Sequence, residues 1–442
     1  MTNRLILCSL VILTFNCEML LAQFNVSTAA ETAYYQEDYL RFTNHNYLPN
    51  VKTVMLYPQG WPLSAPIYDM NNGTPLELHF DVLDSTMGNY MFTLIHCDHD
   101  WTESDLDPQE YLTGPAENYL NEYEYSRNTF QRYIHYSIQI PNFDIEITKS
   151  GNYILMVYQE GDKEDVVLTR RFSVVESGSG VTVSSNVHQA TRVKERYSHQ
   201  EVDFEIIPGR YSITNPYTDL KVVILQNHTW ESAKTDLQPR FVKDNSLDYN
   251  YDGENTFYGI NEFRLIDIAD TRFTGQGVDR VSYTNQENHA YLEQNKSRSA
   301  ITYLQNPDMN GWFFIKNDQP GTNATVDSDY IKTHFALHTK YPLTNGDVYI
   351  FGALTDWQLK PEAKMTYDQT ALEYTAELYL KQGLYNYVYV SVKDGVMEPD
   401  LTSFEGSHYE TENDYTILIY HRPLGLDYDR LIAVEEIKYS NN

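Results

Sequence analysis

Three tryptophans recur at a long and nearly fixed interval, and this feature constrains the fold more than any other. Trp101, Trp230 and Trp357 lie 129 and 127 residues apart (230 − 101 and 357 − 230), and each follows a short apolar run that is typical of a β-strand. The repeats of solenoid proteins are about 20–50 residues long. The longer interval therefore predicts three copies of one domain-sized unit.

The runs themselves have the periodicity of half-buried strands. Apolar residues occupy every second position in residues 76–82, 134–140 and 374–380, and turn dipeptides such as Asn72-Gly73 and Asn345-Gly346 separate the runs. Such alternation is typical of antiparallel sheets that pack one face against the core and expose the other face to solvent. No long amphipathic helix is predicted. We expect an all-β protein of three tandem immunoglobulin-like or fibronectin-like antiparallel β-sandwich domains.

The N-terminus has the pattern of a secretory signal. Arg4 provides the positive charge, residues 5–15 are apolar, and cleavage after Ala22 fits the small residue at that position. The apolar run is shorter than the roughly 20 residues of a spanning helix. We expect a signal peptide over residues 1–22 and an exported mature chain without direct membrane insertion.

The domain boundaries are predicted from the period and from the turn residues. The string Glu176-Ser-Gly-Ser-Gly180 reads as a flexible linker, and Asp318-Gln-Pro-Gly-Thr322 as a second boundary. We expect an N-terminal β-sandwich domain over residues 23–175, a central one over 176–318, and a C-terminal immunoglobulin-like early-set domain over 319–442.

Charge and cysteine usage restrict the function. The formal net charge of −30 disfavours nucleic acid and anionic lipid surfaces as partners. Cys8 and Cys17 lie within the predicted signal, so Cys97 is the single cysteine of the mature chain, which cannot form an internal disulfide. We expect Cys97 to be a small buried residue, with a reactive or intermolecular thiol as the alternative.

Residues 102–131 separate two strand-like runs by about 30 residues, whereas most connections have about 4–6 residues. The segment is acidic and rich in tyrosine, and long loops often carry function. We therefore expect a partner-binding surface there. The candidate contact residues, which include two of the recurring tryptophans, are Trp101, Glu110, Tyr111, Tyr119, Tyr123, Tyr125 and Trp357.

Motifs for chemistry are weak. His96-Cys-Asp-His99 is the densest group of metal-ligand residue types, but neighbouring residues of a strand point to opposite faces, so a strand end is the favoured interpretation and a metal site the alternative. No nucleophile elbow, zinc-protease motif or phosphate loop occurs. We expect no enzyme activity, no resident metal and no cofactor.

The C-terminal third resembles immunoglobulin-like early-set domains that include glycogen-binding modules. The likeness rests on the strings Val348-Tyr-Ile-Phe-Gly-Ala-Leu-Thr-Asp-Trp357 and Leu380-Lys-Gln-Gly-Leu-Tyr-Asn-Tyr-Val-Tyr389. It implies that Trp357 is a sugar-stacking platform flanked by Tyr385, Tyr387 and Tyr389. The alternative is that Trp357 packs the end of a strand, as Trp101 and Trp230 are expected to do.

A second likeness covers nearly the whole mature chain, in strings that follow one another in order. The strings are Leu94-Ile-His-Cys-Asp-His-Asp-Trp101, Glu110-Tyr-Leu-Thr-Gly114, Ser126-Arg-Asn-Thr129, Tyr133-Ile-His-Tyr136, Ser150-Gly-Asn-Tyr-Ile-Leu155, Leu168-Thr-Arg-Arg-Phe172, Asn261-Glu-Phe-Arg264, Asp308-Met-Asn-Gly311, Glu405-Gly-Ser-His-Tyr-Glu-Thr-Glu-Asn-Asp-Tyr415 and Asp427-Tyr-Asp-Arg-Leu431. Together they resemble the plug protein family of the Bacteroidetes type IX secretion system.

This second resemblance implies a non-enzymatic role in protein transport. Family members close the periplasmic mouth of the outer-membrane translocon barrel when a shuttle protein does not occupy its lateral gate. The expected partner is that barrel, and the expected location is the periplasm, peripherally at the outer membrane. An elongated stack of domains would suit a wide lumen. The alternative function is a periplasmic or surface carbohydrate-binding protein led by Trp357.

Overall fold

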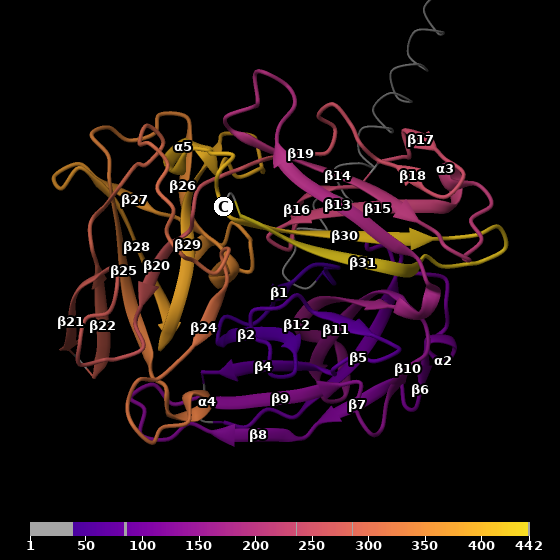
Figure 1. The fold of residues 1–442 in the computed structure, drawn as a ribbon. Helices are drawn as coiled ribbons and strands as arrows, with labels where there is room; N and C mark the ends of the chain where they lie inside the picture. Colours follow the sequence, from indigo (N-terminus) through magenta and orange to yellow (C-terminus); the bar gives the residue numbers. More distant parts are fainter. Residues whose placement is uncertain (1–38, 84–85, 236, 285, 441–442) are drawn as a thin grey trace, which may run out of the picture.

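The computed structural model describes residues 39–83, 86–235, 237–284 and 286–440 (Figure 1). The predicted signal peptide, residues 1–22, lies outside the described residues. Within them the chain is built from β-strands, and the helices have only three or four residues. Most strand pairs are antiparallel, and the sheets pack in face-to-face layers. The predicted all-β class of antiparallel β-sandwiches is confirmed.

The first sandwich packs a six-stranded sheet against a four-stranded one. Its core is rich in aromatic rings, among them Phe80, Phe92, Tyr136 and Tyr153. The larger sheet contains β1 (His45–Asn46), β12 (Asp162–Val175), β11 (Gly151–Gln159), β5 (Tyr90–Cys97) and β7 (Glu117–Leu120) in that order, with β3 (Ile67–Asp69) on β12. The smaller sheet has the order β2 (Val51–Pro58), β4 (Leu76–Val82), β9 (Ile134–Ile140), β8 (Glu122–Tyr125), and a separate pair joins β6 (Leu112–Thr113) to β10 (Glu146–Ile147).

The second sandwich combines strands from two distant parts of the chain. One sheet has the order β13 (Thr182–Gln189), β14 (His199–Ile207), β18 (Leu247–Asp248), β17 (Phe241–Val242), with β19 (Thr256–Tyr258) on β14. The other has the order β16 (Thr229–Lys234), β15 (Leu220–Gln226), β30 (Asn413–His421), β31 (Arg430–Tyr439). Val222, Ile224 and Ile417 share its buried core.

The third sandwich lies between β19 and β30 in the sequence. One layer is formed by β20 (Arg264–Asp267), β29 (Gly383–Lys393) and β24 (Phe313–Ile315), with β26 (Gly346–Phe351) also on β29. The other has the order β21 (Val278–Thr284), β22 (Glu287–Leu292), β25 (Tyr330–His338), β28 (Glu373–Lys381), β27 (Thr366–Asp368), with β23 (Asn295–Lys296) on β25. The short helices of the whole chain are α2 (Pro108–Tyr111), α3 (Pro216–Asp219), α4 (Ala324–Asp327), α5 (Thr402–Glu405), η1 (Ser177–Ser179), η2 (Ala353–Thr355) and η3 (Pro361–Ala363).

The strand pairings imply a division of the chain that differs from the predicted one. The predicted cut near residue 318 falls between β24 and β25, which belong to the two layers of the same sandwich. After that sandwich the chain returns, and β30 pairs with β15 from Leu220–His421 to Gln226–Tyr415. We propose that residues 259–412 form one unit inserted into a second unit made of residues 181–258 and 413–440.

The three sandwiches surround a common centre and do not form an elongated stack (Figure 1). The first lies at the bottom of the view, the third at the left, and the second at the upper right, with the yellow β30 and β31 above the first. Each touches the other two: Asp81 pairs with Lys381, Glu176 pairs with Arg430, and the ring of His228 contacts that of Trp312.

The segment 102–131 contains a short helix and three strands and is not the single long loop that its spacing suggested. It contains α2, β6, β7 and β8. Since β7 pairs with β5 and β8 pairs with β9, the chain passes from the edge of one sheet to the edge of the other at Asn121. The segment therefore closes one side of the first sandwich, and its removal would expose that core.

We predict that a chain truncated after residue 412 loses the fold of its second sandwich. The truncation removes β30 and β31 and exposes Val222 and Ile224, which are fully buried. Loss of two of the four strands of a sheet leaves too little apolar burial for that layer. Limited proteolysis should cut between residues 181 and 258, and the near-ultraviolet circular dichroism should weaken. A truncated chain that melts cooperatively at the full-length temperature would contradict this result.

Candidate functional site

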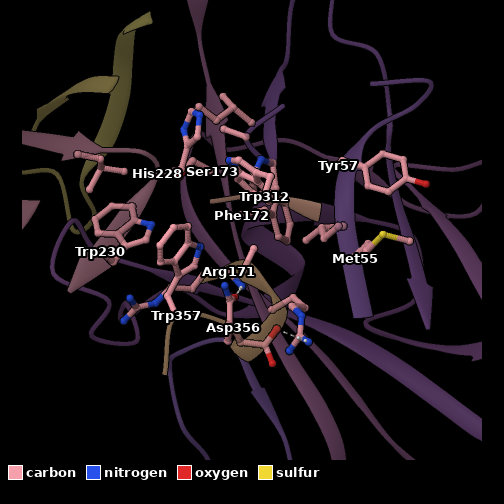
Figure 2. Close-up of a pocket in the computed structure, with 18 of the residues that line it drawn as sticks. Met55, Tyr57, Arg171, Phe172, Ser173, His228, Trp230, Trp312, Asp356 and Trp357 are labelled. Carbon is pink, nitrogen blue, oxygen red and sulfur yellow. Dashed lines mark hydrogen bonds and ion pairs between the residues drawn. The ribbon is translucent and has the colours of Figure 1, made fainter. Parts of the chain in front are cut away.

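A cavity of about 100 Å³ lies where the three sandwiches meet (Figure 2). All three contribute side chains to its wall, and most of these are aromatic or aliphatic. The wall includes Trp101 and Arg171 from the first sandwich, His228 and Trp230 from the second, and Trp312 and Trp357 from the third. The tryptophans that recur along the sequence thus converge on one place in space.

A left-handed backbone conformation occurs at or just before each of the recurring tryptophans. Trp101 and Trp357 have φ angles of 69° and 57°, and His228, which lies two residues before Trp230, has a φ of 59°. These left-handed conformations are uncommon outside glycine, and surrounding contacts must hold them. The rings of Trp101 and Trp230 meet edge to face with centroids 4.8 Å apart. The Arg171 guanidinium lies 4.4 Å from the centre of the Trp101 ring, a cation–π contact.

Trp357 is buried and is therefore no exposed sugar platform. Its side chain is 8 % exposed and packs edge to face against Phe263 and Phe351. Tyr385, Tyr387 and Tyr389, which the glycogen-module likeness placed beside it, are buried as well. Stacking on a sugar needs an accessible ring face. The packing role that was the alternative for Trp357 fits its position.

A buried charged cluster joins the first and third sandwiches. Lys381 Nζ lies 2.6 Å from Asp81 Oδ2, His135 Nδ1 lies 2.7 Å from Asp81 Oδ1, and the Tyr330 hydroxyl donates to Asp81 at 2.7 Å. Burial alone raises the pKa of the Asp81 carboxyl, but the charge of Lys381 and the hydrogen bond from His135 outweigh it. The pKa of Asp81 is therefore held below its ordinary value. Lys381 also lies 4.1 Å from the ring centre of Tyr133.

Polar contacts also join the first and second sandwiches. Arg430 contacts Glu176 at 2.6 Å, and Arg422 contacts Asp98 at 3.0 Å. His99 Nδ1 lies 2.7 Å from the buried Asp429. These links account for two residues of the His96–His99 motif, because Asp98 and His99 contact Arg422 and Asp429 in the connection between β30 and β31.

The rest of that motif is structural too. His96 is buried, with Nδ1 2.8 Å from the Ser104 hydroxyl and Nε2 3.0 Å from the Ser150 carbonyl oxygen. Cys97 is fully buried, as expected, and burial raises the pKa of its thiol far above the usual range. Across the described ranges, no group of three or more His, Cys, Asp or Glu side chains is arranged to hold a metal ion.

The candidate contact residues fall into a buried and an exposed group. Trp101 and Tyr111 are buried like Trp357, and Glu110 is exposed but accepts a hydrogen bond from the Asp107 backbone, where it caps α2. The exposed group is Tyr119 on β7 with Tyr123 and Tyr125 on β8, at 57 %, 41 % and 54 % exposure. We call these three residues the tyrosine edge; whether they bind a partner stays a prediction.

Sequence reasoning missed one exposed tryptophan. Trp61 is 66 % exposed in the turn after β2 and lines a groove of about 440 Å³ between the first and second sandwiches. The signal was present in the string Gln59-Gly-Trp-Pro62, since an aromatic residue between Gly and Pro is poorly placed to enter a sheet core.

The fold and its surface define a class of all-β protein in which three sandwiches form one body with exposed aromatic edges. Residues 51–176, from β2 to the end of the first sandwich, match the family model for the type 9 secretion system plug protein, 1st domain. The chain belongs to the type IX secretion system plug protein family. Proteins of this family are structural components of that secretion system and associate with an outer-membrane component of it. Membership of the family indicates a periplasmic location near the outer membrane.

Among solved structures, a hypothetical protein from Parabacteroides merdae ATCC 43184, determined at 2.30 Å, is similar over its whole length. The two share 33 % sequence identity and a TM-score of 0.86, and the match covers 91 % of this chain and 100 % of that chain. The adhesion glycoprotein Srr1 of Streptococcus agalactiae has 8 % identity and a TM-score of 0.12, with 89 % and 97 % coverage, which is too low to support an argument. No curated protein matches the chain. In the described residues no helix is long and apolar enough to cross a membrane.

We predict that Lys381→Met lowers the free energy of unfolding by about 3–5 kcal/mol, because the Asp81 carboxylate stays buried without its counter-charge. Urea denaturation of the purified variant measures the loss. The double variant Asp81→Asn/Lys381→Met should recover part of it, since both buried charges are then gone. Losses that simply add in the double variant would show that the two residues are not coupled.

We predict that Trp357→Ala destabilises the chain by about 3–5 kcal/mol, because a cavity replaces a buried ring. Chemical denaturation measures this loss, and retention on glucan resin tests the sugar-binding alternative on the same samples. A variant that keeps wild-type stability but loses a glucan retention that the wild type shows would restore Trp357 as a binding residue.

Proposed function

We propose that the protein is a non-enzymatic periplasmic plug that seals the periplasmic opening of the outer-membrane translocon barrel of the type IX secretion system. The match of residues 51–176 to the first domain of the plug family carries this proposal. The similarity to a solved structure covers 91 % of the chain and so includes the other two sandwiches, which the family model does not match. The proposed location is the periplasm, at the outer membrane and attached through the barrel.

The architecture supports a body that blocks an opening. Ion pairs and ring contacts join every sandwich to the other two, so that relative motion of the sandwiches would break them, including the buried pair of Asp81 and Lys381. A body of this kind fills a wide mouth as one piece. The net charge of −30 favours a basic rim as the contact surface and repels acidic chains that approach the same opening.

A plug must also leave its site. Reversible interfaces are mixed in character, with aromatic side chains at the centre and polar groups at the rim. The tyrosine edge has this composition, because Tyr123 and Tyr125 alternate with the exposed Glu122 and Glu124, and the exposed Tyr119 lies on the neighbouring β7. It is the surface that we propose for contact with the translocon.

We predict that loss of the protein makes the outer membrane permeable to hydrophilic antibiotics too large for ordinary porins. The effect should be largest in cells that also lack the shuttle protein, in which nothing else occupies the gate. Uptake rates in the single and double deletion strains measure it, and complementation with the wild-type chain should restore the barrier. Unchanged uptake in the double deletion strain would contradict a sealing role.

A further inference from the structure

The strand β8 is an open edge of the first sandwich. It is the last strand of its sheet, pairs with β9 alone within the described residues, and is exposed at all four positions. In Figure 1 it is the lowest strand of the molecule, with no other element on its outer side. Open edges of this kind are templates for a further strand, so proteins usually cover or charge them.

The alternation of hydrogen-bonded and non-hydrogen-bonded pairs between β8 and β9 shows which backbone groups of β8 have no partner in β9. The N–H of Ser126 donates to the carbonyl oxygen of Tyr133 at 2.9 Å, and the N–H of Tyr133 donates to the Ser126 hydroxyl oxygen at 3.0 Å, so these two residues form a hydrogen-bonded pair. In an antiparallel ladder such pairs alternate with pairs that point away from each other. The next bonded pairs are therefore Glu124 with His135 and Glu122 with Ser137. The N–H and C=O groups of Tyr123 and Tyr125 consequently face outward.

The two faces of β8 differ in chemistry, because neighbouring residues of a strand point to opposite faces. Tyr123 and Tyr125 lie edge to face with centroids 5.9 Å apart, and Tyr123 lies 6.0 Å from the buried ring of Tyr136. The packing holds this aromatic face in place. Glu122 and Glu124 form the other face, and neither makes an ion pair within the part of the chain that the structure describes.

We infer that β8 docks one extended segment of the translocon, which adds a strand to the sheet and carries Lys or Arg at alternate positions. Its backbone would bond to the outward groups of Tyr123 and Tyr125, as in β-strand addition. Its basic side chains would lie beside Glu122 and Glu124, and opposite charges across a strand pair stabilise it. This inference rests on the proposed function and names the contact through which the plug would bind.

A second copy of this chain is a poor occupant of the same edge. Two β8 strands side by side would bring the glutamates of one against those of the other, and like charges directly opposite each other destabilise a pair. The net charge of −30 on each copy adds to the repulsion. Glu122 and Glu124 thus exclude self-association and at the same time select a basic strand.

Tyr125→Pro tests the backbone contact. Proline removes the outward N–H of residue 125 while the bonds of Glu124 and Ser126 to β9 remain, and proline is tolerated in edge strands at such positions. The matched control is Tyr125→Val, which also removes the ring but keeps the N–H. Each variant is used as affinity bait on detergent-solubilised cell envelopes, and the retained translocon barrel is identified by mass spectrometry. We expect about tenfold less barrel with Tyr125→Pro than with Tyr125→Val.

Charge reversal tests the side-chain contact. Glu122→Lys/Glu124→Lys should also reduce the retained barrel about tenfold. The matched control is Glu254→Lys/Glu398→Lys, which makes the same change in net charge at exposed positions of the other two sandwiches. Thermal melting confirms that all variants are folded. In addition, hydrogen exchange at the amides of Tyr123 and Tyr125 should slow when the barrel is bound.

The outcomes separate the two proposals. If the wild type retains the barrel but Tyr125→Pro and the β8 charge reversal retain as much, edge docking is overturned and the plug role stands. Equal losses in the Glu254/Glu398 control would likewise overturn it, because net charge would then explain the binding. If the wild type itself retains no barrel, the plug role fails and the docking inference falls with it.

Discussion

The arrangement of the three sandwiches depends on charges that no single sandwich neutralises by itself. Asp81 is fully buried on β4, and its carboxylate is neutralised by Lys381 on β28 of the third sandwich. Lys381 also donates to the carbonyl oxygen of Thr325. Shifting one sandwich against the other without opening the contact would leave a carboxylate and an ammonium group buried without a partner, which costs several kcal/mol for each ion. The contact therefore specifies one geometry and disfavours sliding.

A second ion pair between two sandwiches lies at the central cavity, where aromatic rings pack beside it. Arg170, buried on β12, contacts Asp356 in the third sandwich at 3.1 Å, while its neighbour Arg171 lies against Trp101 and Trp230. Two adjacent arginines of one strand thus contact both other sandwiches. Since successive side chains of a strand point to opposite faces, one strand can link two neighbours only in this alternating way. The strand β12 thus contacts both other sandwiches near the centre of the body.

Local patterns in the sequence predicted local structure well, and non-local pairing was beyond them. Alternation identified the strands at 76–82 and 134–140, because side-chain period follows directly from backbone geometry. The pairing of β30 with β15 joins residues that lie almost two hundred positions apart, and no short window records it. The tryptophan interval recorded a repeated local structure, since Trp101 and Trp357 both follow a strand and both have positive φ angles. Both side chains are buried, so the interval did not identify a partner-binding surface. Tyr119, Tyr123 and Tyr125 were separable from them only after burial was known.

The acidic side chains have two different physical roles, and whether a carboxylate is buried or exposed distinguishes them. Buried carboxylates such as Asp81 and Asp356 are matched by cations, because an unpaired buried charge is too costly. Exposed carboxylates on β8 are not matched, and water solvates them at little cost. An unpaired acid beside free backbone groups keeps an edge strand monomeric, since any similar strand is repelled. A strand of opposite charge is not repelled, so the charges that disfavour self-association would, in the docking that we infer, also select the partner.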